Sequence, residues 1–231
     1  RIGIVGNGFV GNAIATGLIE FVRDIKIYDI DPVKSTHILS TVINDTDIVF
    51  VSVPTPMRDS LGGEIDLSIL EGALRDIDRC SNGNSIIVVK STVVPGTMER
   101  FQSLFPRLRL VFNPEFLTER FARLDFINAA RIVLGGKRRD VKAVSNMLKP
   151  RFPGAKFIET DFQTAQLIKY MANCFFSVKI SFMNEMHQIA TAANADWDTA
   201  ISGFISDGRI GNSHIDVPGH DGDFGYGGKC F

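Results

Sequence analysis

The chain has 231 residues, of which 45% are hydrophobic, and its 25 lysines and arginines nearly balance its 26 aspartates and glutamates. A chain of this length can bury a sizeable core, either as one large domain or as a domain with a smaller appendage. The balanced charge gives no basis for a nucleic-acid partner, and no apolar run approaches the roughly 20 residues that cross a membrane, so neither nucleic acid nor membrane is expected as a partner.

The first 160 residues alternate short β-branched runs with segments of helical periodicity. Near-continuous apolar strands separated by helical crossovers are typical of a parallel sheet that helices cover on both faces. We therefore predict an α/β fold with a Rossmann-like, doubly wound parallel sheet over residues 1–160. The predicted strands lie at residues 1–6, 24–30, 47–54, 85–91, 108–114, 131–136 and 155–160, and one of the intervening helices is predicted over about 67–79.

A long helix is predicted after the last strand. From Asp161 to about Asn194 the sequence contains neither proline nor glycine, and Asp161 is placed to cap the start of a helix. About 34 residues at 1.5 Å per residue give a length of roughly 50 Å, which suits a helix that links domains or subunits. From Ser202 onward the sequence is rich in glycine and small polar residues and is predicted to be loop. Residues 161–231 are thus predicted to form a second, helical domain.

The three cysteines, Cys80, Cys174 and Cys230, include no CxxC pair and no metal-ligand spacing. An odd number of cysteines without such spacing indicates neither a disulfide framework nor a zinc site. We therefore expect no metal and a reducing, cytoplasmic setting.

The segment GNGFVG, residues 6–11, follows the first predicted strand and opens a helix. There Gly6 allows a tight turn, Gly8 lets the backbone approach a pyrophosphate, and Gly11 lets helix and strand pack closely. Asp29 ends the second strand, where a carboxylate accepts hydrogen bonds from a ribose diol and opposes a 2′-phosphate. NAD is the predicted cofactor, with binding residues Gly6, Gly8, Phe9, Val10, Gly11 and Asp29. The alternative is a flavodoxin-like sheet whose glycines merely turn the chain.

Two further strand ends carry hydroxyl side chains. Thr55 follows the third strand in SVPTP, and Ser91 and Thr92 follow the fourth strand in KSTVVPG. Open α/β sheets bind their ligands outside the carboxyl ends of the strands, so these residues are candidates for a ligand site. A role in a turn or a cap is the alternative, and it is the more common role for such threonines.

Paired polar residues follow on two later segments. Glu115 and Glu119, in NPEFLTE, share a face if this stretch is helical. On the long helix, polar residues that include Lys169 and Asn173 recur at steps of three or four. A surface pair and a solvated stripe explain such patterns, but an amine and an amide one turn apart can also donate hydrogen bonds to an oxyanion.

A series of motifs runs along the whole chain: GNGFVG, SVPTP, KSTVVPGT, NPEFLTE, Lys169 with Asn173, Asn184 with Glu185, DGRIG and FGYGGKCF. In this order they resemble the UDP-glucose 6-dehydrogenase family of nucleotide-sugar dehydrogenases, which make uronic acids. The closing loop is the most specific motif, because a glycine-rich stretch that ends in Gly-Gly-x-Cys-Phe is rare by chance.

The resemblance implies catalysis by a cysteine nucleophile. Cys230 resembles the thiol that forms a thiohemiacetal and then a thioester. Lys169 and Asn173 resemble the pair that steadies the oxyanion, and Glu115 resembles the carboxylate that helps water to hydrolyse the thioester. The implied reaction is the NAD-dependent four-electron oxidation of UDP-glucose to UDP-glucuronate.

Other roles are implied in the same way. Thr92 and Glu119 resemble water-positioning and cofactor-side residues, and Thr55 lies beside the NAD site. The implied substrate-side residues, beyond the catalytic ones, are Phe116, Leu117, Arg209, Phe224, Tyr226, Gly227 and Gly228.

Several alternatives remain open at the level of the sequence. The FGYGG segment favours UDP-glucose over GDP-mannose and UDP-N-acetylmannosamine. A β-hydroxyacid dehydrogenase shares the Rossmann domain and a lysine-asparagine pair but needs no nucleophilic cysteine, and a non-catalytic NAD-binding module is a third possibility. The long helix is expected to form a homodimer, because it carries Phe175, Phe176, Phe182 and Met183.

The chain departs from the family pattern in two places. The segment between Asp29 and Ile48 is much shorter than in typical members, which affects the adenosine side of the cofactor site. The pattern also continues past the cysteine with an aspartate and a C-terminal uridine-binding domain, and neither lies within these 231 residues.

Overall fold

The structure is a computed structural model that describes residues 1–58, 63–118, 121–220 and 222–226. The chain divides into two compact units, Arg1–Lys169 and Tyr170–Phe231. The boundary between them lies inside the long helix α7, Phe162–Ala192, so the first turns of α7 belong to the first unit.

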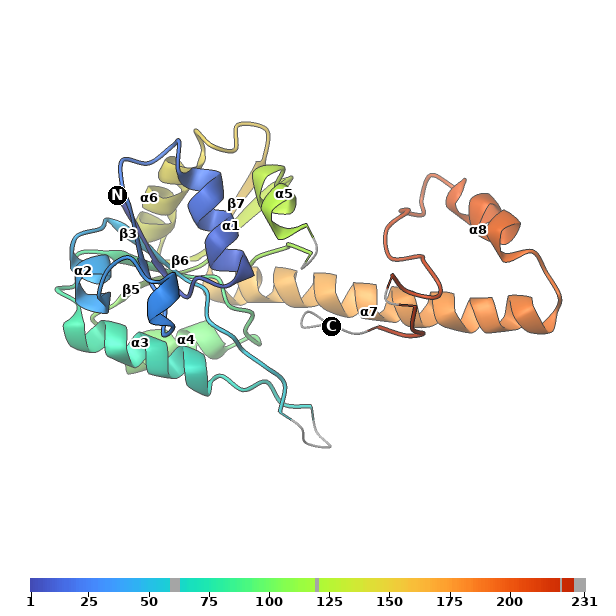
Figure 1. Ribbon diagram of the computed structural model, residues 1–231, viewed down its shortest axis with the longest axis horizontal. Coiled ribbons are helices and arrows are strands. Elements are labelled where there is room, and N and C mark those ends of the chain that lie inside the picture. The colour runs from blue at the N-terminus through green and yellow to red at the C-terminus, as the bar shows by residue number, and fades with distance from the viewer. Residues whose placement is uncertain (59–62, 119–120, 221, 227–231) are drawn as a thin grey trace. The chain divides into compact units, whose positions relative to one another are not determined.

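The first unit is built around a seven-stranded sheet (Figure 1). Its strands are β1 Ile2–Val5, β2 Ile25–Tyr28, β3 Ile48–Val51, β4 Ile86–Val89, β5 Arg109–Phe112, β6 Arg131–Gly136 and β7 Lys156–Thr160. They lie in the order β2-β1-β3-β4-β5-β6-β7 across the sheet. Every residue of β1, β3 and β4 is buried, as the near-continuous apolar runs predicted for strands that are covered on both faces. The predicted Rossmann-like, doubly wound fold is confirmed.

The strand order reverses at β1. The chain passes from β1 to β2 on one side and then places β3 on the other side of β1, and all of these pairings are parallel. Ligands of open α/β sheets bind at the carboxyl ends of the strands at such a switch point. The GNGFVG segment follows β1 and the SVPTP segment follows β3, so the topology brings both segments to this point.

The sheet is parallel, as predicted, except at β6. This strand runs antiparallel to β5, with Phe112 opposite Gly135, and β7 continues parallel to β6. The described chain between β5 and β6 contains one short helix, α5 Ala122–Ile127, which packs against α1, Phe9–Leu18. An antiparallel neighbour does not require a crossover helix on the sheet, so this short connection suffices. One consequence is that β6 lies alongside the residues that follow β5.

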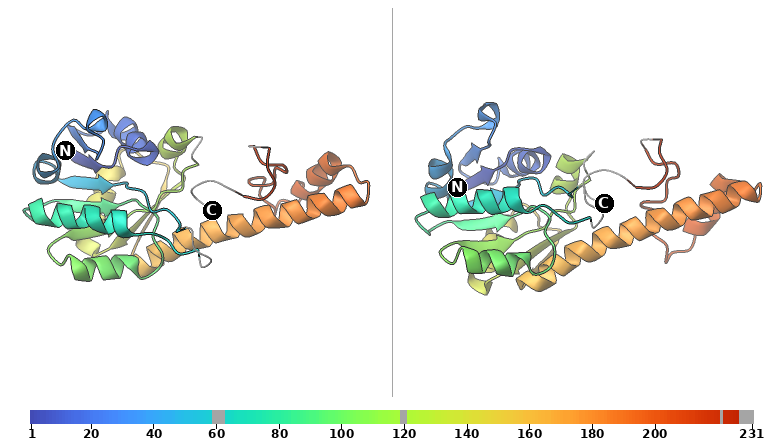
Figure 2. Two further views of the ribbon diagram at one scale, coloured as in Figure 1. Left: turned by 60° about the horizontal axis from the view of Figure 1, so that its bottom comes forward. Right: turned by 90° about the horizontal axis from the view of Figure 1, so that it is seen from below.

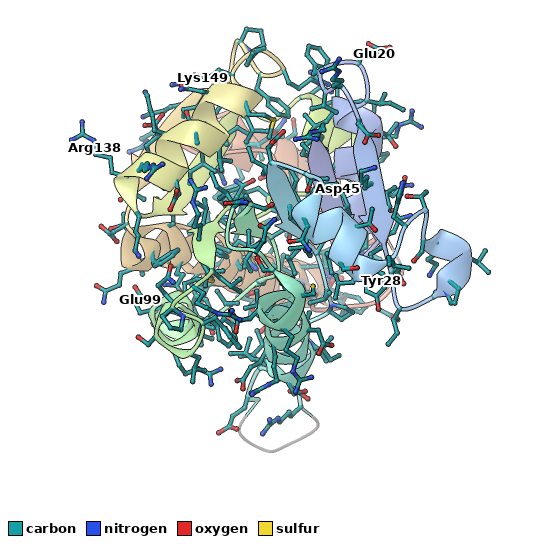
Figure 3. All side chains as sticks on the ribbon, turned by 90° about the vertical axis from the view of Figure 1, so that its left-hand side faces the viewer. Glu20, Tyr28, Asp45, Glu99, Arg138 and Lys149 are labelled. Carbon is teal, nitrogen blue, oxygen red and sulfur yellow. The ribbon has the colours of Figure 1, made fainter. Side chains whose placement is uncertain are left out.

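Helices cover both faces of the sheet (Figure 2). Beyond α1 and α5 they are α2 Leu39–Asn44, α3 Ser68–Cys80, α4 Thr97–Leu104 and α6 Arg138–Leu148. One buried cluster joins the sheet to α2, α3, α4 and the start of α7, and a second joins the sheet to α1, α5 and α6. In Figure 3, Arg138 on α6 points away from the sheet, and Glu99 of α4 lies on the other face of the sheet from α6. These two buried clusters hold the strands in place, and the predicted polar site residues follow the carboxyl ends of those strands.

The shortened segment between β2 and β3 holds a 3-10 helix, Pro32–Lys34, followed by α2. Asp31 caps the 3-10 helix, because its Oδ1 accepts a hydrogen bond from the Val33 amide at 3.1 Å. Ser35 Oγ accepts from the Asp29 amide at 2.7 Å and donates to the Asp29 carbonyl at 2.9 Å. The shortened segment therefore still supports the residue that ends β2.

Helix α7 begins where the sequence predicts. Asp161 Oδ1 accepts from the Thr164 amide at 2.7 Å, which is the expected cap. This hydrogen bond is the main cause that lowers the pKa of Asp161. None of the helices in the described part of the chain is both long enough and apolar enough to span a membrane.

The second unit contains a further helix, α8 Trp197–Ile205, so the prediction of loop from Ser202 onward is wrong for its first residues. Asp196 caps α8 by accepting from the amides of Asp198 and Thr199. Trp197, Ile201 and Ile205 recur every four residues and pack on a small core of Met183, Ile215 and Val217. This apolar stripe, rather than local propensity, keeps the helix intact through Gly203.

Candidate functional site

The three glycines of GNGFVG have three different geometric roles. Gly6 has a φ of +89°, and a side chain there would collide with the Ser52 carbonyl. A side chain at Gly11 would collide with the Gly6 carbonyl. At Gly8 nothing in the described structure lies within 4 Å of the place of a Cβ. Two of the glycines therefore permit the turn and its packing, while Gly8 opens the backbone to a ligand.

The start of α1 fits a dinucleotide pyrophosphate. Gly8 occupies the N-cap position, and no side chain in the described residues caps it. The first amides of a helix attract anions, because they lack partners within the helix and lie at the positive end of its dipole. Phe9 is 37% exposed and Val10 is half-buried, so both border this terminus.

Asp29 holds the glycine loop from the end of β2. Its Oδ2 accepts from the Asn7 amide at 2.6 Å, and its Oδ1 accepts from the Asp31 amide at 2.9 Å. A carboxylate has about four acceptor positions, so two remain for a ribose diol. Asp29 thus both positions the loop and can bind the cofactor.

The hydroxyl groups at the ends of β3 and β4 join the two loops. Ser91 Oγ accepts from the Val53 amide at 3.1 Å and donates to the Val53 carbonyl at 2.7 Å. Thr55 Oγ1 donates to the Thr92 carbonyl at 2.9 Å. Thr55 therefore joins the loops after β3 and β4, and its hydroxyl oxygen can still accept a hydrogen bond from a ligand. Thr92 is half-buried beside it.

A buried ion pair lies where β5 ends. Lys169 Nζ, on α7, is 3.1 Å from Glu115 Oε1, and these side chains are 3% and 8% exposed. The other oxygen of the carboxylate, Oε2, accepts from the Leu117 amide at 2.6 Å. Residues 113–118 are not helical, so Glu115 is oriented by this turn and by α7 rather than by a helix of its own.

Phe116 lies next to this pair and contacts two cations. The guanidinium of Arg131, at the start of β6, lies 4.0 Å from the centre of its ring, and Lys169 Nζ lies 5.4 Å from that centre. Leu117 packs against the apolar cluster on the α1 side of the sheet. Phe116 and Leu117 therefore order the segment that carries Glu115.

Sequence reasoning missed a second buried lysine. Lys90 follows β4 directly and is 5% exposed, and its Nζ donates to Asn113 Oδ1 at 3.0 Å. Burial lowers the pKa of Lys90 to about 8, while the Glu115 carboxylate acts to raise it and Lys169 to lower it further. The signal in the sequence was a lysine immediately after four apolar strand residues, a place where solvent does not reach.

The second unit holds the beginning of the FGYGG segment against α7. Asn184, which is 8% exposed, accepts a hydrogen bond on Oδ1 from the Gly225 amide at 2.8 Å, and its Nδ2 donates to the Ile180 carbonyl. The ring of Phe224 lies 5.7 Å from that of His187. Gly225 has a φ of +85°, so the chain turns there in a conformation that favours glycine. Asn184 is a positioning residue for this segment that the sequence motif alone did not explain.

The other predicted substrate residues of this unit lie on the surface. Arg209 is exposed and forms an ion pair with Asp207, which lowers the pKa of that carboxyl group. Tyr226 is 49% exposed. Lys179 Nζ donates to the carbonyls of Gly211 and Ser213, both at 2.6 Å, and so holds the loop after Arg209 on α7.

Asn173 lies one turn after Lys169 along α7 and is half-buried, and its carbonyl accepts from Ser177 Oγ at 3.0 Å. Four predicted site residues, Glu119, Gly227, Gly228 and Cys230, lie outside the described residues.

Two family models match the chain. The NAD binding domain of the UDP-glucose/GDP-mannose dehydrogenase family matches residues 33–151, and the central domain of the same family matches residues 163–231. The chain belongs to the UDP-glucose/GDP-mannose dehydrogenase family. Residues 33–151 therefore lie in an NAD-binding domain, and the glycine loop and Asp29 precede the matched range in the sequence and complete the same sheet.

Individual relatives agree with this membership. The chain is 31% identical to the UDP-glucose 6-dehydrogenase TuaD of Bacillus subtilis over 268 residues, covering 100% of this chain and 56% of the relative. The structure of a UDP-glucose dehydrogenase from Pyrobaculum islandicum matches with a TM-score of 0.86 at 27% identity, covering 100% of this chain and 61% of that one.

A ternary complex of GDP-mannose dehydrogenase from Pseudomonas aeruginosa matches with a TM-score of 0.79 at 23% identity over 94% of this chain and 59% of that one, which shows the fold alone. The chain spans between 29% and 56% of the length of the first curated relatives.

The position of Asp29 predicts the choice between the two nicotinamide dinucleotides. We expect NAD+ to bind at least about tenfold more tightly than NADP+, because a 2′-phosphate would lie against this carboxylate. Calorimetric titration with both cofactors measures the ratio. Asp31→Asn is the matched control, since Asp31 is on the same loop but caps the 3-10 helix, and it should leave the ratio unchanged. Equal affinities in the wild type would show that Asp29 does not reach the ribose.

Proposed function

We propose that this protein oxidises the primary alcohol of a nucleotide sugar, with UDP-glucose as the preferred substrate, to the corresponding acid with two equivalents of NAD+. The observation that carries the proposal is the buried Glu115–Lys169 pair at the carboxyl edge of the Rossmann-like sheet. A buried carboxylate beside a buried ammonium supplies a base for water and a donor for an oxyanion in one place. Membership of the family supports the same reaction.

The overall oxidation needs a covalent intermediate. NAD+, when bound, accepts a hydride in each of the two oxidation steps. Between these steps the Cys230 thiolate adds to the aldehyde carbon and forms a thiohemiacetal, which prevents the aldehyde from escaping. Loss of the second hydride from that carbon leaves a thioester, and attack by water then releases the acid and the free thiol.

The other predicted site residues have roles in these reaction steps. Lys169 and Asn173 donate to the oxygen on the reacting carbon, and Glu115 accepts a proton from the attacking water. Thr92 and Glu119 position water and cofactor. On the substrate side we place Phe116, Leu117, Arg209, Phe224, Tyr226, Gly227 and Gly228. For the residues of the FGYGG segment this assignment is supported by Asn184, because Asn184 accepts a hydrogen bond from the Gly225 amide within that segment.

The choice of UDP-glucose is supported by the identities. The Bacillus subtilis relative and the Pyrobaculum islandicum structure, both named for UDP-glucose, exceed 25% identity, while the GDP-mannose enzyme does not. We also propose a cytoplasmic setting, supported by Cys80 and Cys174, which are free thiols.

Substrate oxidation by the full-length protein tests this function. We expect two NADH for each UDP-glucose consumed, followed by absorbance, and slower turnover of GDP-mannose and UDP-N-acetylmannosamine. A protein that yields one NADH from 3-hydroxy acids and none from nucleotide sugars would be a β-hydroxyacid dehydrogenase. Cofactor binding without oxidation of any of these compounds would indicate a non-catalytic module.

We also propose that α7 mediates a homodimer. Two of the four residues on which the predicted dimer was based pack within the second unit: Met183 is 2% exposed in its core, and Phe176 stacks on His214. Other apolar residues are 46–67% exposed at alternating steps of four and three, and they form a continuous stripe: Met171, Phe175, Val178 and Phe182, with Ile189 further along. Such spacing is typical of a helix that packs against another helix.

Sedimentation at micromolar concentration tests the dimer. We expect a dimer for the wild type and a monomer for Val178→Glu, because the new charge would be buried in the stripe. Thr191→Glu is the control, since Thr191 is exposed on a different face of α7, and it should remain dimeric. A monomeric wild type would contradict the proposal.

A further inference from the structure

We propose that Lys90 is a positioning residue for the Glu115–Lys169 pair: its buried ammonium leaves this part of the site with one positive charge in excess, which an anionic oxygen of the reacting substrate neutralises. This inference rests on the proposed function, because it names the charge that the oxidation requires when the thiolate adds to the aldehyde. Nothing in the motif pattern assigns a role to this lysine.

Three neighbouring strands hold Lys90 in place. Its Nζ, directly after β4, donates to Oδ1 of Asn113, directly after β5, at 3.0 Å. Nδ2 of Asn113 donates to the Val133 carbonyl in β6 at 2.7 Å. Because Nδ2 is committed to that carbonyl, Oδ1 is the atom that faces the ammonium. The antiparallel strand β6 thus orients the side-chain amide of Asn113, and this amide in turn positions the Lys90 ammonium.

The charges around Lys90 do not balance. In the described parts of the chain it forms no ion pair, whereas Lys169 pairs with Glu115. Both Glu115 and Lys169 are close enough for their charges to act on Lys90. Among the described residues, two ammonium groups and one carboxylate, all more than nine-tenths buried, leave one positive charge where little water can compensate it. Such a region favours a ligand group that brings one negative charge.

The proposed reaction supplies that negative charge. Addition of the Cys230 thiolate to the aldehyde places an anionic oxygen on a tetrahedral carbon while Glu115 keeps its charge. Beside Lys169, with Lys90 present, this oxygen brings the total charge to zero. Without Lys90, the oxygen and Glu115 would present two negative charges to one ammonium. Lys90 therefore acts through the Glu115–Lys169 pair and does not need to touch the substrate.

The same charge makes the reaction depend on pH. The pKa of Lys90 is lowered to about 8, mainly by burial, with Glu115 opposing the shift and Lys169 adding to it. Lys90 is therefore charged at neutral pH and loses its charge as the pH rises through about 8. Since kcat/KM reports on groups of the free enzyme, kcat/KM should fall over the same range.

Four variants of the full-length protein test the inference. Lys90→Met removes the charge, and Asn113→Asp cancels it while leaving the lysine in place. We expect both to lower kcat with UDP-glucose by roughly ten- to a hundredfold, with NAD+ affinity changed less than about threefold. Lys90→Arg keeps a charge that does not titrate, so it should retain activity and lose the fall in kcat/KM near pH 8. Lys142→Met, an exposed lysine on α6, should match the wild type throughout.

A second measurement does not depend on activity. Between its native pKa of about 8 and the ordinary value of lysine, the unfolded chain holds a proton on Lys90 that the native protein lacks, so stability rises with pH. From about pH 7 to pH 10, the unfolding constant of the wild type should fall at least about tenfold relative to that of Lys90→Met.

The outcomes separate the inference from the proposed function. If the wild type oxidises no nucleotide sugar, the proposed function fails, and the unfolding constants alone then decide whether the Lys90 ammonium is buried with a lowered pKa in the native protein. If Lys90→Met keeps the wild-type kcat and pH profile, or if the two unfolding constants change in parallel with pH, the inference is overturned. A loss of activity in Lys90→Met that Lys90→Arg does not restore would mean that Lys90 only fills space.

Discussion

Replacement of Cys230 by serine is expected to lower the rate of the complete oxidation of UDP-glucose by roughly a thousandfold or more, which corresponds to about 4 kcal/mol in the barrier. A serine hydroxyl ionises far less readily than a thiol, and its ester is a poorer acyl intermediate. Binding of NAD+ should be unchanged, because the substitution leaves the glycine loop at residues 6–11 untouched. NADH formed per UDP-glucose, followed by absorbance in the full-length protein, measures the effect.

Cys174→Ser is the matched control. Cys174 is an exposed free thiol on α7, so its replacement should leave both the rate and the stoichiometry unchanged. Two NADH per UDP-glucose at a comparable rate from the Cys230→Ser protein would show that Cys230 is not the nucleophile. The β-hydroxyacid dehydrogenase alternative, which needs no cysteine, would then be preferred.

Lys169→Met is expected to reduce the free energy of unfolding by about 3 kcal/mol, as well as to abolish turnover. The substitution leaves the Glu115 carboxylate buried, with the Leu117 amide as its hydrogen-bond donor but without its ion-pair partner. The loss should lie near the lower end for a broken buried pair, because Lys90 remains close enough to act on the carboxylate. Denaturant unfolding at neutral pH measures the change.

A double-mutant cycle isolates the pair. Adding Glu115→Leu to Lys169→Met should recover much of the stability, because it removes the uncompensated charge, while activity stays absent. Glu71→Ala serves as the surface control: its partners Arg75 and Arg100 are about half exposed, so its loss should cost less than about 1 kcal/mol. If Lys169→Met lowered the free energy of unfolding by as little as Glu71→Ala does, the Glu115–Lys169 pair would not be shielded from water.

The sequence by itself determined those features that depend on neighbouring residues. The turn at Gly6, the packing at Gly11 and the cap at Asp161 follow from backbone geometry over a few residues, and all three are present in the structure. The sequence likewise predicted each of the seven strands. Strands β1, β3 and β4 are apolar runs, because a strand covered on both faces has no polar side to encode. The order of the motifs indicated the family before any contact was known.

The tertiary structure alone decided which residues meet. Lys90 and Asn113 are 23 residues apart and Glu115 and Lys169 are 54 apart, and no local pattern encodes such contacts. The antiparallel course of β6 was hidden for the same reason, because an apolar strand has the same composition in either direction. Helix α8 depends on a core that three distant segments build together. Burial converts Lys90 from an ordinary strand-end lysine into a charge with no counter-ion among the described residues. Burial is a property of the assembled sheet and helices rather than of any one segment.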